Sequence, residues 1–119
     1  MLVDVVERVT SATDGTINPR SLGDYLHLEV GALSRLAHIN RNTLTRNPTS
    51  SKVQEALRPV VEILSIATEL TASQGKAVAW FLHQPLVDFD FKTPQELVTD
   101  GEAEAVKAHL RMLAHGVYG

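Results

Sequence analysis

A long stretch in the middle of the chain repeats apolar residues every three or four positions, which places them on one face of a helix. The repeating residues are Val53, Leu57, Val60, Val61, Leu64, Ala67 and Leu70. Ser51 with Gln54 three residues later is typical of a capping box at a helix start. Proline costs about 3 kcal/mol in a helix interior, so we expect a kink or a restart at Pro59.

Start and stop signals divide the rest of the chain into short helices. Cap residues followed by proline predict helices that begin at Pro19 and Pro94, with Glu96 completing a capping box at the second. Gly101 is expected to end that second helix, Asp100 is a candidate cap for the next one, and Gly116 ends the last. Further helices are expected over about 30–37, 41–46 and 74–84. Leu2–Val6 is the one stretch that suggests a strand, so the predicted fold class is all-α.

Composition places this chain of 119 residues among globular proteins with one compact core or two small, tightly joined subdomains. It has no cysteine, which excludes disulfides and thiolate metal sites. Residues 1–7 lack the basic and apolar regions of a signal peptide, and no apolar stretch approaches the length of a membrane span. We therefore expect a cytoplasmic protein with no membrane association.

The net charge of −3 is unevenly distributed. Residues 20–58 hold six basic and three acidic residues, whereas residues 59–119 hold four basic and eight acidic residues. One basic and one acidic segment suggest two different partners, although small domains also show such imbalance by chance.

Residues 33–46 have the layout of a DNA-binding helix-turn-helix: a helix, a three-residue turn and a short second helix. Ser34 is small enough to let the two helices approach, and Ile39 and Leu44 would hold the second helix on the core. The residues left facing outward, and predicted to bind DNA, are Arg41, Asn42, Thr45 and Arg46. Arginine can form bidentate hydrogen bonds with guanine, and asparagine can do so with adenine. Threonine can bind the phosphates of the DNA backbone.

The turn of this segment departs from the usual pattern, because His38 stands where glycine is common. A non-glycine residue in a left-handed turn costs about 1 kcal/mol or more, although histidine tolerates the conformation better than most residues. The alternative interpretation is a helical hairpin that touches no DNA.

Most aromatic residues lie close together, as Trp80-Phe81 and Phe89-Asp90-Phe91. Clustered aromatic side chains usually belong to a core. They also serve as anchors for a protein partner, and the residue pattern leaves both interpretations open.

The second half of the chain resembles the toxin-binding domain of Xre/MbcA/ParS-type antitoxins. The resemblance lies in Trp80-Phe81, His83-Gln84-Pro85-Leu86, Thr93-Pro94-Gln95-Glu96-Leu97-Val98, Gly101, Val106, Leu110 and Gly116-Val117-Tyr118-Gly119. Residues 36–44 resemble the helix-turn-helix region of the same family, so the likeness covers nearly the whole chain from about Leu22. It implies a DNA-binding helix-turn-helix region (18–58) and a small C-terminal helical toxin-binding domain (59–119). The residues before these (1–17) are expected to form an N-terminal arm.

The resemblance also implies a function. Members of this family neutralise toxins with an RES domain, which consume NAD or use it to ADP-ribosylate a target, and the complex typically represses its own promoter. The antitoxin is thought to block the toxin's NAD pocket partly with its C-terminal end. The toxin-binding residues carried over are Trp80, Arg111, His115, Val117, Tyr118 and Gly119. Without the family resemblance, a frayed terminus is the preferred interpretation of the tail after Gly116.

Nothing in the sequence suggests catalysis, a metal site or a cofactor. We find no nucleophile elbow or phosphate-binding glycine loop, and no two of the five histidines are four residues apart. Two hypotheses remain: an antitoxin that binds an RES-domain toxin and operator DNA, or a stand-alone helix-turn-helix regulator. A homodimer is expected in both, because one short recognition helix rarely suffices. Its interface would involve either the first ten residues or the Val53–Leu70 region.

Overall fold

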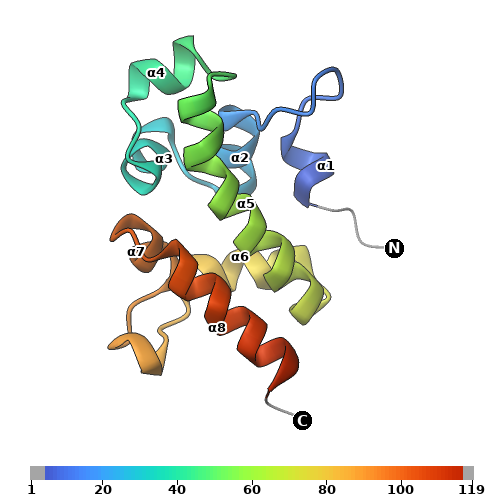
Figure 1. Cartoon of the computed structure of the whole chain (residues 1–119), viewed down its shortest axis with the longest axis vertical. Helices are drawn as coiled ribbons and strands as arrows, with labels where there is room; N and C mark the ends of the chain where they lie inside the picture. The colour runs from blue at the N-terminus through green and yellow to red at the C-terminus, as the bar shows by residue number, and fades with distance from the viewer. Residues whose placement is uncertain (1–4, 117–119) are drawn as a thin grey trace.

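The computed structural model describes residues 5–116, which form a mostly helical fold without strands (Figure 1). The all-α prediction is confirmed. The α-helices are α1 (Val5–Val9), α2 (Pro19–Leu26), α3 (Val30–Ala37), α4 (Arg41–Arg46), α5 (Ser51–Thr71), α6 (Gln74–His83), α7 (Pro94–Thr99) and α8 (Ala103–His115), with a 3₁₀ helix η1 (Val87–Phe89). Within the described part of the chain, no helix is long and apolar enough to cross a membrane.

Helix α5 runs through the centre of the molecule, from the end that holds α2, α3 and α4 to the end that holds α6, α7 and α8 (Figure 1). It packs against α1 near one end and against α6 and α8 near the other. Leu57, Ile63 and Leu64 on its inner face are fully buried. The expected boundary between residues 58 and 59 falls inside this helix, so both halves of the chain share one hydrophobic core.

The helix does not restart at Pro59, because α5 is continuous from Ser51 to Thr71. A proline removes one backbone hydrogen bond of the helix. The neighbouring side chains of Leu57, Val60 and Val61 are at most 5% exposed. Each buried aliphatic side chain contributes about 1.5–3 kcal/mol, which together exceeds the cost of the proline.

The predicted capping box at Ser51 and Gln54 is wrong. Ser50 is the cap, and its hydroxyl accepts a hydrogen bond from the Val53 N–H. The Gln54 side chain turns instead toward the chain before α2: its Oε1 accepts from the Ile17 N–H, and its Nε2 donates to the carbonyls of Ile17 and Pro48. Gln54 is 8% exposed, so its amide satisfies backbone groups that the core would otherwise leave unpaired.

The strand expected at Leu2–Val6 is wrong for its last two residues, because Val5 and Val6 form the start of helix α1. Residues 2–4 lie outside the described residues. Val5 and Val9 are one helical turn apart and fully buried, and α1 packs on α2 and α5. The β-branched residues favour a strand locally, but the described chain offers them an apolar surface to cover and no neighbouring strand to pair with.

Most predicted helix ends are confirmed. Asn18 and Asn40 cap α2 and α4 through their side chains, and Thr93 with Glu96 forms the capping box of α7. Gly101 ends α7 with a φ of +86°, a conformation that favours glycine. Asp100 does not cap α8; its carboxylate instead pairs with Lys92 at 2.8 Å, and α8 begins after Glu102 without a side-chain cap.

An ion-pair cluster joins α5 to α8. Lys107 is 7% exposed, and its ammonium lies 2.7 Å from a carboxylate oxygen of Glu104 and 3.0 Å from one of Glu62. Hydrogen bonds to Glu104 and then to Glu62 raise the pKa of Lys107 above its ordinary value. The two glutamates thus keep the buried ammonium charged at the contact between the two longest helices.

Candidate functional site

Helix α3, a three-residue turn and helix α4 form the segment predicted to bind DNA. His38 ends α3 in the left-handed conformation, with a φ of 57°. The Ser34 hydroxyl donates to the Ile39 carbonyl and so ties α3 to the turn. Ile39 and Leu44 are 5% and 2% exposed, and they hold the turn and α4 on the core. Because Leu44 is the buried residue of the short helix α4, it determines which face of that helix is exposed to solvent.

All four predicted DNA-binding side chains lie on the exposed face of α4, namely Arg41, Asn42, Thr45 and Arg46. The Thr45 hydroxyl lies 3.1 Å from the carbonyl oxygens of both Arg41 and Asn42. It therefore donates its hydrogen bond within the helix. Thr45 therefore offers a ligand an acceptor oxygen and a methyl group. Asn42 and Arg46 keep donors directed to solvent.

Arg41 does not extend straight away from α4. A side-chain carbon added at Gly31, in the first turn of α3, would lie 3.9 Å from both Nε and Cζ of Arg41. The same point would lie 3.7 Å from Nη1 of Arg35, which follows Gly31 by one helical turn. Arg35 is absent from the DNA-binding residues that the sequence predicts. Its position four residues after a glycine was the available signal, because residues four apart share one helix face.

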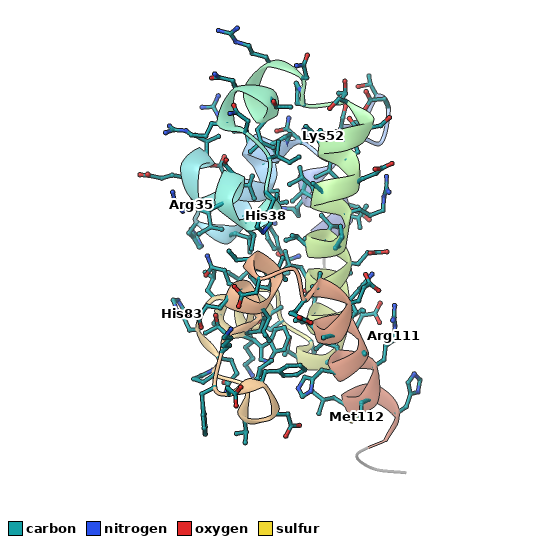
Figure 2. The ribbon with its side chains drawn as sticks, turned by 60° about the vertical axis from the view of Figure 1, so that its left-hand side comes forward. Arg35, His38, Lys52, His83, Arg111 and Met112 are labelled. Atoms are coloured by element: carbon teal, nitrogen blue, oxygen red, sulfur yellow. The ribbon has the colours of Figure 1, made fainter. Side chains whose placement is uncertain are left out.

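The turn after α3 also contacts the other half of the molecule. The His38 imidazole Nε2 donates a hydrogen bond to the Thr99 carbonyl at the end of α7, 61 residues later. Figure 2 shows His38 between the end of α3 and the α7 coil below it. A side chain in the turn of the predicted DNA-binding segment thus touches the segment that resembles the toxin-binding domain.

The residues predicted to bind a toxin do not all lie together. Trp80 is half-buried on α6 and packs against the core. Arg111 and His115 are exposed and one turn apart on α8, beside Met112, which is 52% exposed. Figure 2 shows Arg111 and Met112 on the last turns of that helix. The predicted tail residues Val117, Tyr118 and Gly119 lie outside the described residues.

A tight loop after α6 exposes two large apolar side chains. Leu86 and Lys92 close the loop through an antiparallel bridge, in which the Leu86 N–H donates to the Lys92 carbonyl. Val87 is 72% exposed and Phe91 is 66% exposed. Asp90 and Phe91 both have φ near +60°, a conformation that costs non-glycine residues of the order of 1–3 kcal/mol each. His27, His38 and Ala72 adopt the same left-handed conformation, so the exposed apolar side chains, and not the strain, mark this loop as a candidate contact surface.

The core interpretation of the aromatic cluster holds for part of it, and the partner interpretation stays a prediction for the exposed remainder. Phe81 is fully buried. The Phe89 ring meets the His109 ring edge-to-face, with their centroids 5.7 Å apart, and so fastens the loop to α8. Phe91 is left exposed two residues later. The sequence showed that aromatic residues gather here, but burial by α8 decides which of them remain available to a partner.

The two candidate surfaces are the exposed face of α4 and the η1 loop with the end of α8. They lie at opposite ends of a molecule about 45 Å long. Figure 1 shows α4 at the upper end and the η1 loop with the end of α8 at the lower end. Within residues 5–116, no group of three or more His, Asp or Glu side chains is placed to hold a metal ion. Comparison with protein-family models, with curated proteins and with solved structures gives no match.

Proposed function

We propose that this protein is the antitoxin of a type II toxin–antitoxin system. It binds an RES-domain toxin through its C-terminal half and represses its own operon through its N-terminal half. The distance between the two candidate surfaces is the observation that carries the proposal. A protein with polar, basic side chains at one end and exposed apolar side chains at the other is suited to hold two chemically different partners at once.

The DNA-binding part of the proposal rests on α4. A helix with a buried Leu44 on one side and exposed Asn42 and Arg46 on the other matches the needs of a major-groove reader. The surrounding stretch, residues 20–58, has twice as many basic as acidic residues, and this favours approach to phosphates.

The toxin-binding part rests on the η1 loop and α8. Val87, Phe91 and Met112 are among the most exposed large apolar side chains of the described residues. Phenylalanine and methionine are enriched in protein–protein interfaces relative to the rest of the surface. Arg111 and His115 lie on the last turns of α8, just before the tail that the family resemblance assigns to the toxin's NAD pocket.

Co-expression tests the proposal directly. The protein is produced together with the product of the neighbouring gene, which we expect to be the RES-domain toxin, the complex is isolated, and cellular NAD is measured. We expect a stable complex, restored growth and restored NAD. Deleting residues 116–119 is expected to weaken inhibition at least tenfold while leaving DNA binding and melting temperature unchanged.

The outcomes separate the parts of the proposal. Full neutralisation by the truncated protein would refute the role of the tail but not the antitoxin role. Failure to form a complex or to restore NAD would refute the antitoxin role. DNA binding by the protein would then support a stand-alone transcriptional regulator.

A further inference from the structure

We infer that Arg35 and Arg41 form a phosphate-binding site for the DNA backbone over the first turn of α3. This inference rests on the proposed DNA-binding function and changes the role of one residue within it. Arg41, predicted from the sequence to read bases, is assigned to the DNA backbone, and Arg35 joins the DNA-binding surface.

The site is defined by two cations that lie near one point. Nη1 of Arg35 and Cζ of Arg41 both lie within 4 Å of the position that a side-chain carbon on Gly31 would take. Glycine leaves this position empty, and these two atoms, one from α3 and one from α4, therefore lie less than about 8 Å apart. Both arginines are exposed, and Figure 2 shows Arg35 on the outer side of α3.

No acid neutralises this pair in the described part of the chain. The ion pairs found there involve Lys92 and Lys107, and neither guanidinium group makes a hydrogen bond or an ion pair. Glu29, two residues before Gly31, is exposed and pairs with neither of them. Two like charges this close repel each other, and an anion between them removes that repulsion. Guanidinium groups suit phosphate in particular, because they bind its oxygens with two parallel hydrogen bonds.

The backbone beside the arginines favours the same ligand. Glu29 is the cap residue of α3, and its side chain accepts no hydrogen bond from the helix. The first N–H groups of α3 therefore remain available, and they carry the positive end of the helix dipole. α4 is joined to α3 by only three residues, so a phosphate held here fixes the position of Asn42 and Arg46 relative to the DNA.

The test introduces a competing carboxylate. Gly31→Glu places an acid between the two arginines, and Gly31→Gln adds nearly the same bulk without charge. Both are expected to fold, because an added carbon there meets only ordinary contacts with flexible side chains. Arg35→Gln removes one cation directly, and Lys76→Gln removes an exposed cation from α6 as a charge control. Melting temperatures verify that each variant is folded.

Binding is measured by fluorescence anisotropy between 50 and 200 mM salt, with a duplex carrying the promoter of its own gene and a scrambled duplex. One phosphate contact contributes about 0.9 to the slope of log K against log salt, or roughly eightfold in affinity at 0.1 M. For each protomer that binds, we expect Arg35→Gln to lose about eightfold and Gly31→Glu about 60-fold, equally on both duplexes and with slopes lowered by about 0.9 and 1.8. Gly31→Gln should lose much less, and Lys76→Gln should match the unaltered protein.

Two results would overturn the assignment while leaving DNA binding intact. One is an Arg35→Gln variant that behaves like Lys76→Gln; the other is a loss confined to the promoter duplex, which indicates base reading. Absence of binding to both duplexes by the unaltered protein, alone and with its RES-domain partner, would overturn the site together with the DNA-binding proposal.

Discussion

The imidazole of His38 donates a hydrogen bond to the backbone carbonyl of Thr99 and so joins the turn before α4 to the end of α7. This contact explains why a histidine stands at a left-handed position where glycine would be unstrained. The hydrogen bond between the two halves of the molecule offsets the conformational strain of His38 in the turn.

Replacing His38 should separate these two effects. His38→Ala keeps the left-handed strain and loses the hydrogen bond, which lowers the free energy of unfolding by about 1 kcal/mol. His38→Gly loses the same bond but relieves about 1 kcal/mol of strain, so its stability should equal that of the unaltered protein. Urea denaturation measures both, and equal stability of the two variants would contradict this explanation.

Gln54 should be essential for attaching the segment before α2. Gln54→Ala leaves the buried N–H and carbonyl of Ile17 without partners, which costs about 1–3 kcal/mol for each group. Gln54→Glu retains an acceptor but sets a carboxylate against the carbonyls of Ile17 and Pro48. That environment raises the pKa of the new carboxyl in the folded state. The deficit of Gln54→Glu should therefore be smallest below about pH 4 and grow as the pH rises; a pH-independent deficit in urea denaturation would argue against this geometry.

Two adjacent serines give a matched test of where α5 begins. Ser50→Ala removes the hydroxyl that accepts from the Val53 N–H and should cost about 1 kcal/mol. Ser51→Ala alters an exposed first-turn residue and should change stability by less than about 0.5 kcal/mol. The free energies of unfolding of the two variants decide between the observed cap and the one predicted from the sequence. A larger loss for Ser51→Ala would favour the predicted cap.

Lys107 should stabilise the α5–α8 contact in a pH-dependent way. Its pKa is raised in the folded state by Glu104 and then by Glu62. The resulting stabilisation is fully present below the ordinary pKa of 10.5 and is lost as the pH rises through the higher folded value. Lys107→Met lacks this contribution, so its difference in unfolding free energy from the unaltered protein should stay constant from about pH 7 to 9.5 and shift at higher pH. Groups that titrate in both proteins, such as Lys92, cancel in this difference. An unchanged difference through about pH 11 would refute the coupling.

Phe91 should matter for the partner and not for the fold. Phe91→Gly removes a side chain that is 66% exposed and relieves a left-handed conformation, so the melting temperature should hold or rise. Binding of the toxin proposed above, measured by calorimetry, should weaken at least tenfold, as expected when an interface hot spot is truncated. Val6→Ser alters an exposed apolar residue on α1 and serves as the control. Equal binding by both variants would exclude the loop from the interface.

The dimer interface predicted over Val53–Leu70 is largely covered within the chain. Val53, Leu57 and Leu64 are fully buried against other helices, and Leu70 alone among the repeating residues of that run is exposed. The buried apolar face of this run therefore cannot pair two copies, and the homodimer itself stays a prediction. Sequence periodicity identifies an apolar face but does not distinguish a face buried in its own core from one that binds a second copy.

The sequence by itself determined where most helices begin and end. Asn18, Asn40, Thr93 and Gly101 act on backbone groups within a few residues of themselves, so their effect can be read from the local sequence. Periodicity likewise placed Leu44 inward and the predicted DNA-binding residues outward.

Only the tertiary structure decided what depends on residues distant in the sequence. Gln54 is paired with a residue 37 positions away and His38 with one 61 positions away, and neither spacing leaves a periodic signal. The exposure of Phe91 depends on α8 covering Phe89 but not its neighbour. The meeting of Arg35 and Arg41 depends on how α4 folds back along α3 over Gly31. Local hydrogen bonding thus set the helices, whereas packing between them set the surfaces on which the proposed functions rest.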